Sequence, residues 1–405
     1  MKIRNGLMRL FLAACLIVFC VAMVEAAPAE FHIGIVTGTV SQGEDEVRGA
    51  EAMIADYGDV KDGGMIQHLT YPDNFAAEQE TTISLIVSMA TDPLMKAIVM
   101  NQAVPGATEG FRRVREMRPD ILLLAGVAHE DPLVIGKVAD LAMRNDFVSA
   151  GYRVIWAAKQ LGADTFVHVS FPRHMSVETL TRRRMIFEEA CKDLGIKWVF
   201  ETAPDPLSDV GIVGAQQFLL ENVPKWVETY GKNASFYCTN DAHTEPLIRQ
   251  IVEYGGTFVE ASLPSPLLGY PGALGVDLTN EKGNFPAIMK KIEDAIVAKG
   301  AGGRLGTWSF SFQFCATVGL VEHAINVING ESQMTNMQDL VKAFSKHTPG
   351  AQWGGAYYVD GTTGERLDNY ILLLQDTYIF GKGYIGSAAI DVPDKYLMIS
   401  SGLEK

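Results

Sequence analysis

The chain has 405 residues, with 34 Lys and Arg against 48 Asp and Glu and a formal net charge of −14. This acidic balance argues against nucleic acid and anionic membrane surfaces as partners. The length is sufficient for two α/β domains, each with its own core.

The first residues are typical of an export signal. An apolar run over residues 10–24 follows the basic residues Lys2, Arg4 and Arg9. The run is too short for a membrane span, which needs about 20 residues, and small residues follow it. We therefore predict a signal peptide over 1–26 and an exported, periplasmic protein. Its removal takes away three basic residues and one acidic residue, so the charge changes from −14 to −16.

The cysteines indicate neither a metal cluster nor a disulfide framework. The stretch Leu-Ala-Ala-Cys ending at Cys15 matches a lipoprotein box, but the apolar run before it is short, so we favour ordinary export over lipid anchoring. Cys15 and Cys20 leave with the signal. The other three, Cys191, Cys238 and Cys315, lie far apart in apolar segments. We expect them to be buried free thiols.

The mature chain alternates apolar strands with amphipathic helices. The first series predicts strand 31–37, helix 43–57, strand 65–71, helix 76–91, strand 97–101, helix 107–117 and strand 121–125. After a further strand leading to Asp146, the second predicts helix 149–161, strand 165–170, helix 177–194, strand 197–201, a helical region at 214–229, strand 236–238 and a helix ending at 254. This alternation predicts parallel sheets covered by helices on both faces.

The two series predict an α/β protein with two doubly wound parallel-sheet lobes. Helix 286–298, strand 305–310 and helix 313–328 are too few for a third domain, so we expect them to complete the first lobe. Lobe 1 is then 30–146 plus 278–335. Lobe 2 is 147–277 plus the tail 336–405, whose placement the sequence does not determine. Several crossings between the lobes predict a hinge around a cleft.

Three segments, in this order, resemble the type I periplasmic (solute) binding protein superfamily. Asp146 to Gly162 resembles the opening of its second lobe, Thr239-Asn240-Asp241 its Asn-Asp corner, and Gly275-Val276-Asp277 the place where its chain crosses back. Within that clan the chain is most similar to an uncharacterised family of exported bacterial proteins. The resemblance implies a protein without catalytic activity or cofactor. It would close two lobes on a small molecule and deliver it to a membrane permease.

Polar and aromatic residues at strand ends and crossings form the predicted ligand site. We assign Thr37, Thr39, Gln42, Asn101, Gln102, Asp146, Phe171, Arg173, His174, Asn240, Asp241, Asp277 and Trp308. Asp277 is included through the resemblance alone. Amides and carboxylates near an aromatic face suit a small polar organic ligand such as a sugar, nucleoside or amino-acid-like compound. Arg173 favours a carboxylate or phosphate on that ligand.

Several of these residues have a structural alternative. Asp146 and Asp241 are also typical helix caps. Asn101–Gln102 suits a turn, His174 a solvated loop, and Trp308 the core of a strand.

Two other functions fit the same sequence. The protein is alternatively a ligand-sensing module for a membrane receptor, or a secreted enzyme that uses His129, Glu130 and His174 in the cleft. The histidines show no metal-ligand spacing, and no nucleophile–base pair stands out. Arg182–Arg184 points in three directions around a helix, which indicates a solvated face.

Overall fold

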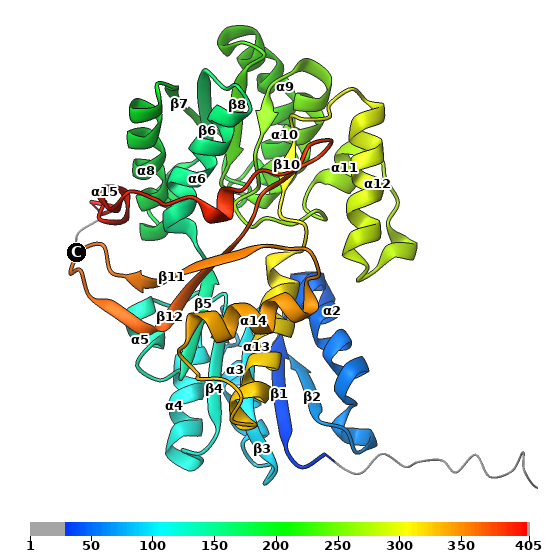
Figure 1. Cartoon of the computed structure of the whole chain (residues 1–405), viewed down its shortest axis with the longest axis vertical. Helices are drawn as coiled ribbons and strands as arrows, with labels where there is room; N and C mark the ends of the chain where they lie inside the picture. Colours follow the sequence, from blue (N-terminus) through cyan, green and yellow to red (C-terminus); the bar gives the residue numbers. More distant parts are fainter. Residues whose placement is uncertain (1–28, 403–405) are drawn as a thin grey trace, which may run out of the picture.

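The computed structural model describes residues 29–402 and consists of two α/β lobes, one above the other in Figure 1. The predicted class of two lobes with parallel sheets is confirmed. The predicted signal peptide over 1–26, with Cys15, lies outside the described residues. Within them, no helix is long and apolar enough to cross a bilayer. Cys191, Cys238 and Cys315 are buried free thiols, as predicted.

The first lobe is built on a sheet with the strand order β11-β12-β5-β4-β3-β1-β2. Its strands are β1 (His32–Thr37), β2 (Ile66–Thr70), β3 (Met95–Asn101), β4 (Leu122–Gly126), β5 (Leu141–Asn145), β11 (Trp353–Val359) and β12 (Arg366–Gln375). Its helices are α2 (Val40–Tyr57), α3 (Gln79–Met89), α4 (Ala107–Met117), α5 (Pro132–Ile135), α13 (Phe312–Ile328) and α14 (Met337–His347). Neighbouring strands are parallel except for β11, which pairs antiparallel with β12.

The second lobe is built on a sheet with the order β7-β6-β8-β9, all parallel. Its strands are β6 (Thr165–Ser170), β7 (Lys197–Thr202), β8 (Ala234–Cys238) and β9 (Thr257–Phe258). Its helices are α6 (Phe147–Gln160), α7 (Pro172–Met175), α8 (Glu178–Leu194), α9 (Gly211–Tyr230), α10 (Asp241–Tyr254), α11 (Tyr270–Leu274), α12 (Phe285–Ala298) and α15 (Asp394–Leu397). A small sheet joins β10 (Gly306–Thr307), β13 (Tyr378–Ile379) and β14 (Gly383–Tyr384).

The central strands form because their apolar side chains are covered on both faces. In β8 every residue from Ala234 to Cys238 is buried, and β1 is buried from Ile33 to Thr37. Continuous burial of this kind requires helices on both sides of a parallel sheet. The carboxyl ends of these strands are then free to carry polar residues.

The prediction that the chain returns to the first lobe at Gly275–Asp277 is wrong. Leu305 forms a parallel bridge with Phe258, at the edge of the second sheet. Helix α12, which lies with the second lobe in Figure 1, buries Ile288, Ile292 and Ile296. These apolar side chains keep 278–307 in the second lobe, and the chain returns only just before α13.

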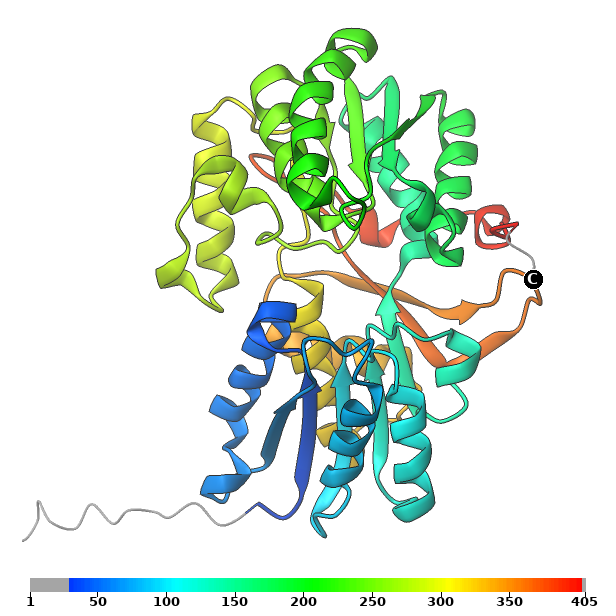
Figure 2. The ribbon, with the colours of Figure 1, turned by 180° about the vertical axis from the view of Figure 1, so that it is seen from behind.

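The tail is also placed differently from the prediction for 336–405. Helix α14 packs on α13, and β12 pairs with β5 in the first sheet. β12 carries apolar residues on both faces, Ile371 to Leu374, and such a strand needs a position inside a covered sheet. Only the segment after Asp376 reaches the second lobe, where β13 pairs with β10 and α15 packs on α6 and α8. Figure 2 shows this path from behind, with the orange strands between the lobes and the red segment continuing upward.

The contact of α13 with α14 depends on a glycine. A Cβ added at Gly319 would overlap the ring of Phe344, which is fully buried. Alanine is favoured over glycine inside a helix by about 1 kcal/mol. Overpacking of a buried contact costs about 1–3 kcal/mol.

We therefore expect Gly319→Ala to lower the free energy of unfolding by about 1–2 kcal/mol, despite the gain in helix propensity. Urea unfolding of the mature chain measures this. Gly302→Ala is the control, because its nearest contact would be an ordinary 3.4 Å to a Val297 methyl group. If Gly319→Ala were as stable as the wild type, α14 would not be held tightly against α13.

Candidate functional site

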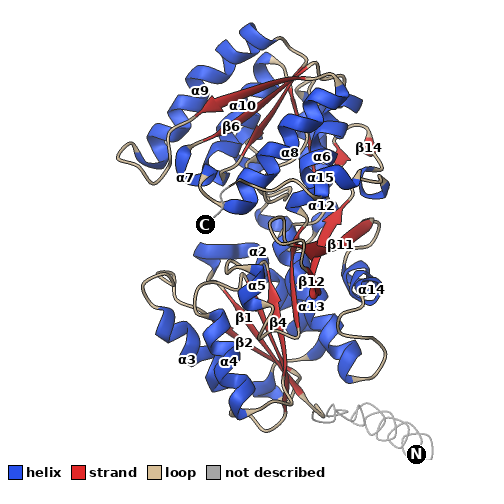
Figure 3. Ribbon diagram, turned by 90° about the vertical axis from the view of Figure 1, so that its left-hand side faces the viewer, coloured by secondary structure: helices blue, strands red, loops and turns tan. Residues whose placement is uncertain are grey.

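Both sheets have a point where the strand order reverses, and these points face one another. In the first sheet the reversal lies between β1 and β3, and in the second between β6 and β8. Figure 3 shows that α2, which follows β1, and α7, which follows β6, both lie next to the space between the lobes. Open α/β sheets bind ligands beyond the carboxyl ends of their strands at such points. We call this set of strand ends the interlobe face.

On the first lobe, residues after β1 form hydrogen bonds with Asp73, which follows β2. The sequence analysis did not identify this aspartate. The hydroxyl of Ser41 donates to the Asp73 carboxylate at 2.9 Å, and the hydroxyl of Thr39 donates to the same carboxylate. The Gln42 amide donates to the Asp73 backbone carbonyl at 2.9 Å. Thr39 and Gln42 thus lie together, and the two hydroxyls hold the pKa of Asp73 below its usual value. Thr37 is buried beneath them.

A second acidic group, Glu46, is fully buried below this loop. One of its carboxyl oxygens accepts hydrogen bonds from the Gly38 amide at 3.0 Å and the Gln102 side chain at 3.3 Å, while its other oxygen is buried without a partner. Burial raises the pKa of Glu46 to about 8. It is therefore mainly a neutral carboxylic acid at pH 7, with an O–H to donate. Its sequence signal was a carboxylate on the apolar face of α2, one residue before Val47.

The ends of β3 and β4 have strained backbone. Gln102 has a φ of 48° and Val127 a φ of 47°, a region that a β-branched residue rarely adopts. Strain of this kind is concentrated at ligand-binding sites. Asn101, in contrast, has a positioning role, because its side-chain amide donates to the Gln313 carbonyl at 2.6 Å and to the Thr317 hydroxyl at 2.7 Å.

On the second lobe, the corner after β8 contains two neighbouring residues with different roles: Asn240 caps a helix, and the Asp241 carboxylate has no protein partner among the described residues. The Asn240 side chain accepts a hydrogen bond from the Ala242 amide at 2.9 Å and thereby caps α10. Asp241 has no hydrogen-bond or ion-pair partner among the described residues. It is exposed to solvent. The surrounding protein nevertheless desolvates its carboxylate enough to raise its pKa to about 6.

The corner after β6 supplies an aromatic pair. The rings of Phe171 and His174 lie 4.1 Å apart between centroids, and His174 Nδ1 lies 3.1 Å from the Thr239 hydroxyl. That hydroxyl also contacts the Ser170 hydroxyl at 2.7 Å, which links the ends of β6 and β8. Burial, and then the charge of Arg173, lower the pKa of His174 to about 4. His174 is thus neutral at physiological pH.

Arg173 does not face an unpaired site. Its guanidinium forms two bonds with Asp205, at 2.6 and 2.8 Å. This pairing holds the pKa of Asp205 at about 2. The hypothesis that Arg173 recognises a ligand carboxylate therefore loses its basis.

Three further predicted residues do not belong to the loops after β1, β3, β6 and β8. Asp146 is buried and caps α6, with its carboxylate accepting from the Ser149 amide at 2.8 Å. Trp308 is 4% exposed and donates its indole N–H to Glu260 at 3.1 Å. Asp277 lines a cavity of about 240 Å³ between α2 and the 276–288 segment. The structure does not bring these three together with the strand-end residues.

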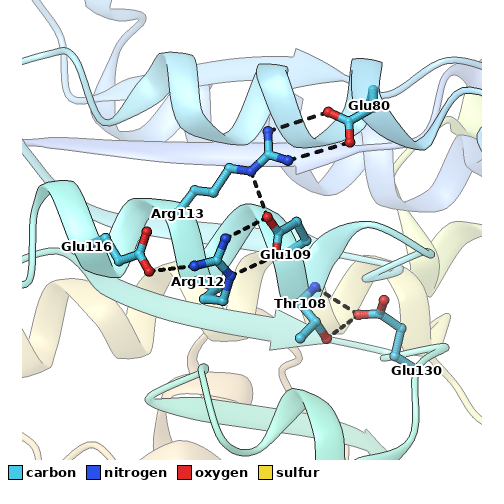
Figure 4. A network of polar contacts seen from close by, with 7 residues as sticks. All are labelled: Glu80, Thr108, Glu109, Arg112, Arg113, Glu116 and Glu130. Carbon is cyan, nitrogen blue, oxygen red and sulfur yellow. Dashed lines mark hydrogen bonds and ion pairs between the residues drawn. The ribbon is translucent and has the colours of Figure 1, made fainter.

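Glu130 is occupied by a structural task. Its carboxylate accepts from the Gly106 amide at 3.2 Å. It also accepts from the Thr108 amide at 2.8 Å and the Thr108 hydroxyl at 2.5 Å (Figure 4). It therefore caps the N-terminus of α4, next to a surface network of ion pairs formed by Arg112 and Arg113. Among residues 29–402, no group of three His, Cys, Asp or Glu lies close enough to hold a metal ion.

The interpretation of Arg182–Arg184 as a solvated face is wrong. Arg182 and Arg183 are 1% and 2% exposed. Arg182 donates to the carbonyls of Ile399, Val359 and Leu397, at 2.8, 3.2 and 2.6 Å. The tail, whose placement the sequence analysis did not determine, covers this side of α8.

A family profile described as protein of unknown function (DUF3798) matches residues 31–306. The chain belongs to the DUF3798 family. A second family profile matches residues 317–399. An uncharacterised protein of Treponema pallidum (strain Nichols) is 40% identical over 220 residues, covering 54% of this chain and 100% of the relative.

Two solved structures show the fold of this DUF3798 protein. A suggested transcriptional regulator from Clostridium difficile 630 has a TM-score of 0.78 and 22% identity, covering 87% of this chain and 99% of that one. A sugar ABC transporter protein from Actinomyces odontolyticus ATCC 17982 has a TM-score of 0.51 and 9% identity, covering 77% and 88%. The predicted uncharacterised family is confirmed, and the two structures share the predicted two-lobed α/β fold.

The buried acid Glu46 predicts a specific pH dependence of stability. Its pKa is about 8 in the folded protein and near 4.5 ordinarily, so its contribution is fully present below pH 4.5 and is lost as the pH rises through 8. Glu46→Gln keeps the shape but cannot ionise. We expect the variant to match the wild type near pH 5 and to exceed its stability at pH 9 by a few kcal/mol, on the order of 1.4 kcal/mol per unit of pKa shift.

Thermal and urea unfolding between pH 5 and pH 9 provide the measurement. Glu44→Gln is the control, because Glu44 is an exposed residue on the same helix. A constant difference between wild type and Glu46→Gln across this range would show that Glu46 is ionised throughout.

Proposed function

We propose that this DUF3798 protein is an exported solute-binding protein. It closes its two lobes on a small polar organic molecule and delivers that molecule to a membrane transporter. The observation that carries the proposal is the opposed pair of strand-order reversals, each lined by polar side chains. On the first lobe these are Thr39, Gln42 and Gln102, and on the second His174 and Asp241.

The chemistry of these groups suits a binder better than a catalyst. Glu46, His129 and His174 are kept mainly neutral at pH 7 by burial, with pKa values of about 8, 4 and 4. Neutral acids and imidazoles donate and accept hydrogen bonds without adding charge. The carboxylate of the enzymatic alternative, Glu130, is held by the N-terminus of α4. Delivery without conversion is the activity that this arrangement supports.

The hinge connects the two halves of the proposed site. Three segments pass between the lobes: Asn145–Phe147, Ser309–Phe312 and Gln375–Thr377. Bending in a few such residues allows the lobes to close around a ligand. A closed form then presents both lobes together to a membrane partner.

A thermal-shift screen of the mature protein tests the proposal. The panel contains sugars, nucleosides, amino acids, organic acids and phosphate esters. A ligand that binds only the folded protein raises its stability by RT ln(1 + [L]/Kd), about 2.7 kcal/mol at a hundredfold excess. We expect one class to give a clear shift and the compound to be recovered unchanged. Conversion of the compound would instead support an enzyme.

Asp241 and Asn240 allow ligand binding to be separated from helix capping. We expect Asp241→Asn to weaken binding of the compound found in the screen at least tenfold. Its melting temperature without ligand should stay close to that of the wild type, because the Asp241 carboxylate makes no protein hydrogen bond. Asn240→Ala is the matched variant and should cost about 1 kcal/mol of stability through the lost cap. A melting temperature for Asp241→Asn as low as for Asn240→Ala would identify Asp241 as structural.

A further inference from the structure

Two arginines near the hinge have no acidic partner. Arg144 lies at the end of β5 and is half-buried, and Arg183 lies on α8 and is 2% exposed. Neither forms an ion pair with any residue from 29 to 402. Buried cations are normally paired, because an uncompensated charge in the protein interior is costly.

Most of the donors of these arginines are unused. Arg144 donates one hydrogen bond, to the Ala128 carbonyl at 3.3 Å, and Arg183 donates one, to the Ser262 hydroxyl at 2.9 Å. The Nε of each arginine is buried without a partner. A guanidinium has five N–H donors, so most donors of each side chain have no hydrogen-bond partner among residues 29–402. Each guanidinium also lies over an aromatic ring, Arg144 at 5.4 Å from the Phe147 centroid and Arg183 at 5.1 Å from the Tyr237 centroid.

The two guanidinium groups are close enough for their charges to interact. Asn145 donates to the Ser262 carbonyl at 3.4 Å, so Asn145 and Arg183 meet at the same residue. Burial lowers the pKa of Arg144, and the positive charge of Arg183 lowers it further. The hydroxyl of Tyr370, on the strand next to β5, is also buried without a partner. Polar groups from three separate segments thus converge without satisfying one another.

The nearest acid does not neutralise the cluster. Glu260 interacts with the charge of Arg183, but it accepts its hydrogen bonds from Trp308 at 3.1 Å and Thr377 at 3.0 Å. Burial raises the pKa of Glu260 to about 7, so it carries only part of a negative charge at neutral pH. An excess of positive charge therefore remains at the hinge end of the interlobe face.

We propose that the ligand carries an anionic group, a carboxylate or a phosphate ester, that binds between Arg144 and Arg183. This rests on the proposed solute-binding function and assigns a ligand class to the same site. Arginine binds both groups with paired, charge-assisted hydrogen bonds. The Tyr370 hydroxyl, which is buried without a partner, supplies a further donor beside the anion. Asp241, on the other side of the face, contacts the uncharged or cationic part of the ligand.

The thermal-shift panel is divided into three arms to test this assignment. One arm contains neutral sugars and nucleosides, the second amino acids and organic acids, and the third sugar phosphates and nucleotides. We expect the shift in the second or third arm, which also distinguishes carboxylate from phosphate. The Kd of the compound should rise with ionic strength, because salt screens the attraction between charges.

Single variants show whether the arginines carry the binding. We expect Arg144→Gln and Arg183→Gln each to raise the Kd of the anionic compound about 10- to 100-fold, measured by titration calorimetry. Arg184→Gln is the matched control on the same helix, with its guanidinium stacked 4.4 Å from the centroid of the Phe200 ring, and should change the Kd less than threefold. The ligand-free melting temperatures of both test variants should equal or exceed that of the wild type, because each removes one of two like charges.

A probe that requires no knowledge of the ligand completes the test. Inorganic phosphate and sulfate at constant ionic strength should stabilise the wild type and lose this effect in the Arg144→Gln/Arg183→Gln double variant. The opposing result is a neutral compound whose Kd is unchanged in Arg144→Gln and Arg183→Gln but raised in Asp241→Asn. That result would overturn the anion assignment and leave the solute-binding function intact. A panel without any shift, together with no effect of phosphate or sulfate, would count against both. A large drop in the melting temperature of Arg183→Gln without ligand would identify this arginine as a structural residue and also overturn the assignment.

Discussion

The arrangement of the two lobes depends on the hydrogen bonds that tie the crossing segments to one another. The side-chain oxygen of Gln375 accepts from the Ser309 hydroxyl at 2.8 Å and from the Phe310 amide at 3.1 Å. The Asp146 amide donates to the Leu373 carbonyl at 2.7 Å. Hydrogen bonds therefore connect all three crossings through β12 and the residues at its end. These links favour the single hinge that the proposed closure requires over independent bending at each crossing.

This hinge sets the electrostatics of the site that lies in front of it. The segments converge from both lobes, so ionisable groups at the strand ends are surrounded by protein even where they remain in contact with solvent. Desolvation then favours the neutral form of each group, which raises the pKa of Glu46 and lowers that of His129 and His174. Arginine is the exception, since it stays protonated in proteins. A chain with a net charge of −14 thus has a local excess of positive charge at the hinge.

Much of the fold could be predicted because its signals are local. Continuous apolar runs identified β1, β3 and β6, and the polar residues at their ends identified the interlobe face. The cap at Asp146 followed the local rule, but α10 is capped by Asn240 and not by Asp241, the residue that the sequence analysis considered as a cap. The predicted crossing at Asp277 failed because Gly275-Val276-Asp277 resembles a strand end, although what holds 278–307 in place is packing by α12. That packing involves residues far apart in the sequence, which spacing does not reveal.

The site residues that were missed have the same kind of cause. Arg182 and Arg183 sit in a run of three arginines, a pattern that on an isolated helix indicates solvent. The tail covers them, and its position was not determined by its own pattern. Glu46 was missed because a carboxylate on an apolar helix face is usually a charge at the edge of the core. Here it becomes an acid that accepts from a loop amide and from Gln102, which directly follows β3.

The tail therefore extends the first sheet and also contributes groups to the proposed site. β12 covers the edge of β5, next to Arg144, and brings Tyr370 beside it. Gln375, which links two crossings, belongs to the same tail. Backbone carbonyls of the tail also accept hydrogen bonds from Arg182, the residue before Arg183. The first family profile ends at 306 and the second begins at 317, yet groups from both segments meet at the hinge. The proposed closure and the proposed anion site therefore draw on both segments, since β12 pairs with β5 at Arg144 and the tail carbonyls hold Arg182, the neighbour of Arg183 on α8.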